Sequence, residues 1–91
     1  IFASRVMNGR SPLINEDGRQ LRDFVSVYDV ARACCLAMEH PEAPGNVFNV
    51  GSGVPYSVLD IAREVARTLN AEHIRPEVTG RYRSGDIRHC Y

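Results

Sequence analysis

The feature that most constrains the fold is an apolar stripe with helical spacing across residues 57–70. Its members are Val58, Ile61, Ala62, Val65, Ala66 and Leu69. Such a stripe predicts an amphipathic helix that buries one face against another element. Ser57 suits the N-cap, and Asp60 favours the first turn. We interpret Ser57 as a structural cap, because the spacing of the three histidines suggests no general base beside it.

A second apolar stripe predicts a helix that begins near Ser26 or Tyr28 and ends near His40. Its members are Val30, Ala31, Cys34, Ala37 and Met38. The prolines at positions 41 and 44 then end the helix and begin a loop.

Short extended segments separate these helices. We expect strands at residues 11–14, 21–27 and 46–50, and extended chain at 74–78 and 86–91. Residues 1–8 fit the end of a helix that Gly9 stops, and residues 15–18 form a turn by composition. This order predicts a small mixed α/β fold. Because both ends fall within an expected element, we expect residues 1–91 to be a piece of a larger protein.

Composition narrows the classes of partner. The net charge is zero, which argues against a surface built for nucleic acid or an anionic membrane. No apolar run approaches the ~20 residues of a membrane-spanning helix, and the first residues lack the pattern of a signal peptide. The expected location is therefore the cytoplasm. All eleven basic residues are arginine, so this segment houses no lysine-dependent chemistry.

The cysteines and histidines do not have the spacing of a metal site. Cys34 and Cys35 are neighbours on a predicted helix, and Cys90 stands alone near the end. An odd number of cysteines without a C-x-x-C motif fits neither zinc nor a redox pair, so we expect small buried thiols.

Three patterns could bind an anion. Arg22 and Asp23 follow a turn, although such a pair is often a surface ion pair. The Gly51-Ser52-Gly53 turn could cradle phosphate on its backbone N–H groups, but it is shorter than a P-loop and fits a structural turn better. The third pattern is residues 81–88, with three arginines around a glycine, and a solvated basic loop would look the same.

Together and in this order, these patterns become specific. The run RDFVSVYDVARACCLAMEHPEAPGNVFNVGSG, a serine-capped helix and YRSGDIRHCY resemble the extended short-chain dehydrogenase/reductase family of nucleotide-sugar enzymes. The wording EDGRQLRDFV and GDIRHCY is most similar to 4-epimerases of the dTDP-rhamnose or UDP-glucose type. The resemblance implies that residues 1–91 are the C-terminal substrate-binding lobe of a Rossmann-type NAD-dependent epimerase or dehydratase.

The resemblance also implies roles for individual residues toward a nucleoside-diphosphate sugar. Arg22 and Arg83 would bind the diphosphate, and Asp86 would hold the ribose or orient Arg83. The strand before the turn would line the base with backbone groups, and this strand corresponds to Pro12, Leu13 and Ile14. The family often has an aromatic residue before the turn, where this chain has Asn15, so stacking on the base is in doubt.

The resemblance places NAD and the catalytic residues elsewhere. The family binds NAD at a glycine-rich turn and uses a tyrosine followed four residues later by lysine, and this chain has neither. We therefore expect no catalytic, cofactor-binding or metal-binding residue here, and no activity from the 91 residues alone. We also expect a homo-oligomer. The alternatives are part of a 4,6-dehydratase, a non-catalytic anion- or nucleotide-binding module, and an arginine-rich interaction domain.

Overall fold

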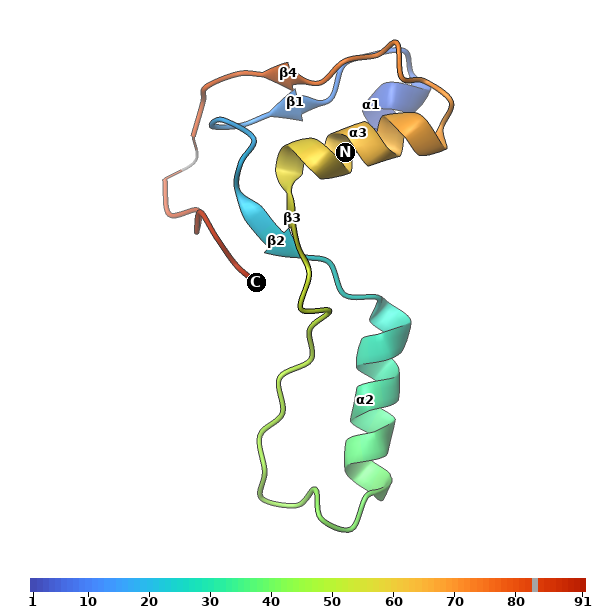
Figure 1. The fold of residues 1–91 in the computed structure, drawn as a ribbon, viewed down its shortest axis with the longest axis vertical. Helices are drawn as coiled ribbons and strands as arrows, with labels where there is room; N and C mark the ends of the chain where they lie inside the picture. Colours follow the sequence, from blue (N-terminus) through green and yellow to red (C-terminus); the bar gives the residue numbers. More distant parts are fainter. Residues whose placement is uncertain (83) are drawn as a thin grey trace.

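The computed structural model describes residues 1–82 and 84–91 (Figure 1). In chain order the elements are α1 (Phe2–Met7), β1 (Leu13–Ile14), β2 (Leu21–Asp23), α2 (Val27–Glu39), β3 (Pro55–Ser57), α3 (Val58–Thr68) and β4 (Glu77–Val78). The strands form two small sheets, with β1 parallel to β4 and β2 antiparallel to β3. The fold is therefore mixed α/β, as the sequence predicted.

The core lies in the part of the molecule formed by α1, α3 and the β1–β4 sheet, drawn at the top of Figure 1. Helix α1 contacts α3. The buried apolar residues of this part are Val6, Pro12, Ile14, Ala62, Ala66 and Ala71. Three of these six residues are alanines, so α1 and α3 approach closely but little apolar area is buried.

Helix α3 begins as the sequence predicted, with a capping box. The Ser57 hydroxyl accepts a hydrogen bond from the Asp60 N–H, and the Asp60 carboxylate accepts one from the Ser57 N–H. On the apolar stripe, Ala62 and Ala66 are buried, and most of the other members are half-buried. The two interior alanines therefore mark the line along which α3 meets the rest of the core.

The turn before β2 docks on the first turn of α3. The carbonyl oxygens of Gly18 and Gln20 accept hydrogen bonds from the N–H groups of Leu59 and Val58, at 3.0 Å each. Gly18 has φ of 76°, and a Cβ atom there would lie 3.2 Å from both Ile14 and Leu59. Glycine is therefore required at this position for both its backbone angle and the close approach.

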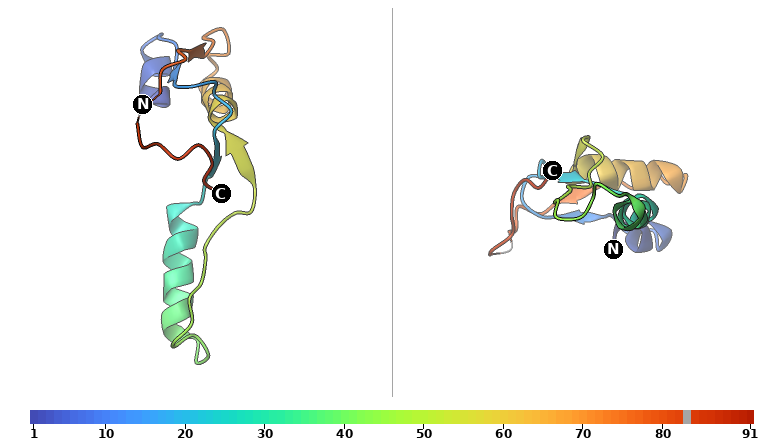
Figure 2. Two further views of the ribbon diagram at one scale, coloured as in Figure 1. Left: turned by 90° about the vertical axis from the view of Figure 1, so that its left-hand side faces the viewer. Right: turned by 90° about the horizontal axis from the view of Figure 1, so that it is seen from below.

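Helix α2 lies apart from the core, and none of its residues is buried (Figure 2). The chain measures 51 × 31 × 18 Å, with a radius of gyration of 17.0 Å. A compact chain of this length would have a radius of gyration of about 12 Å. The apolar stripe predicted on α2 therefore exists as a surface that the described residues leave largely uncovered.

Three expectations were wrong, each because the predicted contact partner is not there. Residues 46–50 form no strand, and Val47 is 95% exposed, because a strand needs hydrogen-bonding groups of a neighbour. The strand expected at 21–27 ends at Asp23, where its pairing with β3 ends, and β3 itself was not predicted. The cysteines are free and exposed rather than buried: Cys34 and Cys35 lie on α2, which the described residues leave uncovered, and Cys90 lies in the segment beside β2.

Candidate functional site

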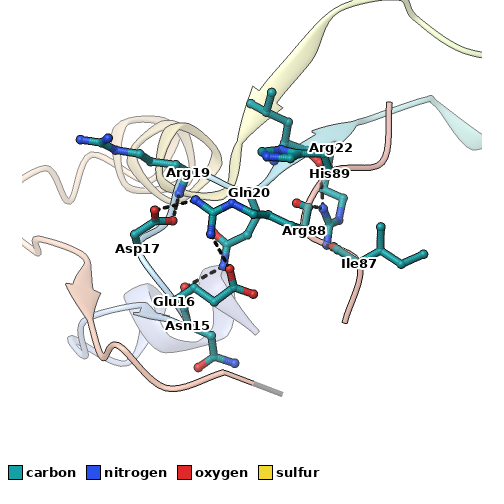
Figure 3. Close-up of polar contacts among 10 residues, drawn as sticks. Asn15, Glu16, Asp17, Arg19, Gln20, Arg22, Ile87, Arg88 and His89 are labelled. Carbon is teal, nitrogen blue, oxygen red and sulfur yellow. Dashed lines mark hydrogen bonds and ion pairs between the residues drawn. The ribbon is translucent and has the colours of Figure 1, made fainter. Parts of the chain in front are cut away.

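The candidate site is where the turn at residues 15–18, strand β2 and the segment 86–90 meet (Figure 3). This segment runs beside β2 on the side away from β3. The Cys90 N–H donates to the Leu21 carbonyl at 3.0 Å, and the Asp23 N–H donates to the Cys90 carbonyl at 3.1 Å. These bonds form a parallel bridge between Arg22 and Cys90. Strand β2 is thus paired on both edges.

Arg22 is half-buried and binds the main chain of the segment 86–90. Its Nη1 donates to the Arg88 carbonyl at 2.8 Å, and its Nη2 donates to the Ile87 carbonyl at 2.5 Å. Nη1 also donates to the Leu21 carbonyl at 2.8 Å. All three acceptors are neutral, so they leave the positive charge of the guanidinium uncompensated. A surface ion pair with Asp23, the simpler sequence-based interpretation, is not formed among the described residues.

Arg88 is placed differently from Arg22, because it meets two carboxylates. Its Nη1 lies 2.9 Å from Glu16 Oε2, and its Nη2 lies 2.7 Å from Asp17 Oδ2. The hydrogen bond from Arg88, followed by one from the Arg19 backbone N–H, lowers the pKa of Asp17 below its ordinary value. Arg88 is part of the arginine loop that the sequence marked as an anion site, but here its partners are already within the chain.

Asp23 organises the glycine turn that follows residues 46–50. Its carboxylate accepts hydrogen bonds from the Ser52 hydroxyl, the Ser52 N–H at 2.8 Å and the Gly53 N–H at 3.4 Å. The Ser52 hydroxyl, and then these backbone groups, lower the pKa of Asp23. The N–H groups that could have cradled a phosphate therefore bind a carboxylate of the chain, and the structural interpretation of this turn is confirmed.

The strand predicted to line a base keeps one edge open. Pro12 and Ile14 are fully buried, and their carbonyl oxygens accept hydrogen bonds from the N–H groups of Glu77 and Thr79. Successive residues of a strand direct their backbone groups to opposite edges. The N–H and C=O of Leu13 therefore face away from β4, toward an edge that no other described strand occupies. Leu13 itself is 40% exposed.

The two remaining predicted residues belong to the segment that follows Tyr82. Arg83 lies outside the described residues, so its position relative to Arg22 stays a prediction. Asp86 is exposed and directly precedes Ile87, whose carbonyl Arg22 binds. Asp86 is therefore the residue next to one that Arg22 contacts.

Sequence reasoning missed two residues that shape the turn. Gln20 is 6% exposed, and its Nε2 donates to the Asn15 carbonyl at 2.9 Å, while its buried Oε1 meets no hydrogen-bond partner among the described residues. His89 Nδ1 accepts a hydrogen bond from the Leu21 N–H at 3.3 Å. No local pattern announces either role, because each partner lies across a turn or in a distant segment.

Within residues 1–82 and 84–91, no helix has the length and apolar character needed to cross a membrane. No group of three histidine, cysteine or acidic residues within the same ranges could hold a metal ion.

Comparison with known proteins places the chain in a family. The family model described as NAD dependent epimerase/dehydratase family matches residues 1–51, more than half of the sequence. The chain belongs to the NAD-dependent epimerase/dehydratase family. The matched residues include the turn at 15–18, β2 and the whole of α2. Of the candidate site, the segment 86–90 lies outside the match.

Individual members of the family agree with this assignment. A dTDP-L-rhamnose 4-epimerase of Burkholderia thailandensis is 42% identical over 75 residues, which are 82% of this chain and 20% of the relative. A UDP-N-acetylglucosamine 4-epimerase of Methanobrevibacter ruminantium, in complex with UDP-N-acetylmuramic acid, has a TM-score of 0.84 at 33% identity. A UDP-glucose 4-epimerase of Thermotoga maritima, with UDP-glucose, has a TM-score of 0.82, also at 33% identity.

The matches to solved structures extend over nearly the whole chain. Each covers 97% of the present residues and 27% of the other chain. The chain thus spans about a fifth of the curated relative and about a quarter of the solved structures.

Proposed function

We propose that residues 1–91 are the nucleotide-sugar-binding part of an NAD-dependent 4-epimerase that acts on a nucleoside-diphosphate sugar. The observation that carries the proposal is the placement of Arg22. Its guanidinium is held at the edge of β2 by neutral carbonyl groups, while the acidic residues of the adjacent turn pair with Arg88 instead. A fixed, uncompensated guanidinium is suited to binding a diphosphate through two parallel hydrogen bonds.

The surrounding groups suit the other parts of such a ligand. The backbone N–H and C=O of Leu13 can take the hydrogen-bonding edge of a base. Asp86 can accept a hydrogen bond from a ribose hydroxyl or orient Arg83. The kinship with 4-epimerases whose solved structures contain UDP-sugars supports this class of ligand. The base and the sugar are left open, because the aromatic residue common in the family is replaced by Asn15.

The residues of this chain do not fit a dinucleotide site, so NAD would be bound outside residues 1–91. The glycine turn at 51–53 gives its N–H groups to Asp23, and lysine is absent from the sequence. Arg22, Arg83 and Asp86 would bind and orient the substrate, and so supply the positioning part of catalysis. The apolar face of α2 would lie against the remainder of the enzyme, and a cytoplasmic homo-oligomer stays a prediction.

The product of the complete enzyme tests the proposal. Incubation with UDP-glucose or a dTDP-sugar, followed by NMR of the sugar ring, should give the C4 epimer. A 4-keto-6-deoxy product would identify a 4,6-dehydratase instead. If the enzyme bound the nucleotide sugar without changing it, residues 1–91 would belong to a non-catalytic binding module.

A further inference from the structure

The segment 86–90 is attached to β2 mostly through main-chain groups, which carry little sequence information. The bridge at Cys90 uses backbone N–H and C=O groups, and Arg22 binds backbone carbonyls. Among the described residues, two side chains of the segment form hydrogen bonds with the rest of the molecule, those of Arg88 and His89. His89 binds the Leu21 N–H of β2, whereas Arg88 binds the turn that precedes β2. The Arg88 side chain therefore fixes the position of the segment relative to this turn.

The geometry of Arg88 fixes direction as well as distance. Each end of its guanidinium meets a carboxylate of a different residue, Glu16 at 2.9 Å and Asp17 at 2.7 Å. A planar fork held at both ends cannot swing, whereas a single point charge could. The guanidinium of Arg88 thus spans the turn from one residue to the next (Figure 3).

The turn at residues 15–18 is held by contacts from both Arg81 and Arg88. Glu16 has φ of 54°, in the left-handed region that residues other than glycine seldom adopt. Its N–H donates to the Arg81 carbonyl at 2.7 Å, and its carboxylate binds Arg88. Contacts from both ends of the stretch 81–88 therefore hold an unfavourable backbone conformation in place.

Arg88 also connects this turn to Arg22, the residue proposed to bind the diphosphate. Its side chain binds Glu16 and Asp17, and its own carbonyl accepts the 2.8 Å hydrogen bond from Arg22. We propose that Arg88 is a positioning residue that orients Arg22 and holds the segment carrying Asp86 beside it. With two carboxylates at its guanidinium, Arg88 does not itself bind the anion. This inference rests on the proposed function, since it assigns the geometry of the same site.

The test uses Arg88→Gln in the complete enzyme, with Arg75→Gln as the matched control. Arg75 is exposed, precedes β4 and lies beside α3, where it lines a surface hollow that includes none of residues 15–18 or 86–90. Amide hydrogen exchange should become faster at Asp23 and Cys90, whose N–H groups hold the bridge, and stay unchanged at Thr79 in the β1–β4 pairing. Affinity for UDP-glucose or a dTDP-sugar should fall about 2- to 10-fold. This corresponds to the lower part of the range of interaction energies between residues of one hydrogen-bond network.

A charge exchange separates positioning from a general loss of structure. Asp17→Arg combined with Arg88→Asp restores opposite charges across the contact, so it should recover part of the affinity that each single change loses. The inference would be overturned by unchanged exchange at Asp23 and Cys90 in Arg88→Gln, or by a double variant no better than the singles. If the wild-type enzyme bound neither nucleotide sugar, the proposed function would fail, and the exchange measurement would still decide whether Arg88 holds the segment.

Discussion

Removal of the Arg22 guanidinium should weaken nucleotide-sugar binding strongly and leave NAD binding nearly unchanged. A guanidinium has five N–H donors, and three of those of Arg22 bond the Leu21, Ile87 and Arg88 carbonyls. The two that remain have no acceptor among the described residues, so a diphosphate can accept hydrogen bonds from them while the carbonyls keep the guanidinium in place. Counted as one charge-assisted contact, the Arg22–diphosphate interaction contributes about 1.5–3 kcal/mol. Arg22→Ala should therefore raise the dissociation constant by about 10- to 150-fold.

Calorimetric titration of the complete enzyme with UDP-glucose and a dTDP-sugar measures this effect. Arg22→Lys should also be costly, because an ammonium group cannot replace a two-ended fork. Arg19→Ala is the matched control, since Arg19 is exposed between the turn at residues 15–18 and β2, and its side chain points away from Arg22 (Figure 3). Equal losses in Arg22→Ala and Arg19→Ala, or a loss of NAD affinity of the same size, would refute the reasoning.

Three further predictions concern stability. Val6→Ala removes two methyl groups from a side chain that is 3% exposed, so urea unfolding should show a loss of about 2 kcal/mol; the exposed neighbour Met7→Ala should cost far less, and similar costs would contradict the assigned core. The pKa values of Asp17 and Asp23 are lowered by folding. The stability that the two ionised carboxylates contribute is therefore present above about pH 4 and is lost as the pH falls through their pKa values in the folded protein. Melting temperatures measured from pH 2.5 to 7 should fall less at acid pH in Asp17→Asn than in wild type. A Cβ atom at Gly51 would lie 2.8 Å from the Asp23 carboxylate, so Gly51→Ala should speed amide exchange at residues 52–53, and an unchanged rate would argue against this contact.

The helices could be predicted from the sequence because their signals are local. The capping pair Ser57 and Asp60 and the stripe from Val58 to Leu69 lie within one element, and α3 begins where they indicate. The strands could not be bounded in the same way, since a strand ends where its partner ends. Residues 46–50 have a strand-like sequence but pair with no strand in the part of the chain that the structure describes, whereas β3, with a proline at its start, pairs along all three of its residues.

In the candidate site, too, features with a local sequence signal could be predicted, and contacts between distant residues could not. Arg22 could be singled out because its block of sequence resembles a family motif, whereas its hydrogen bonds to the Ile87 and Arg88 carbonyls could not be predicted. The partners of Arg88 could not be found from the sequence, because Glu16 and Asp17 lie more than 70 residues before it and only the folded chain brings them together. Arg88 is paired with the carboxylates of Glu16 and Asp17, whereas Arg22 binds neutral carbonyls. No local sequence pattern distinguishes the two arginines in this way.

We propose that the nucleotide sugar and NAD bind different parts of the complete enzyme, and hydrogen exchange measured by mass spectrometry tests this directly. Saturation with UDP-glucose or a dTDP-sugar should slow exchange in peptides that cover residues 12–22 and 84–91. NAD alone should leave both regions unchanged and protect peptides outside residues 1–91. Protection of these regions by NAD, or protection by the nucleotide sugar confined to the rest of the enzyme, would contradict the account.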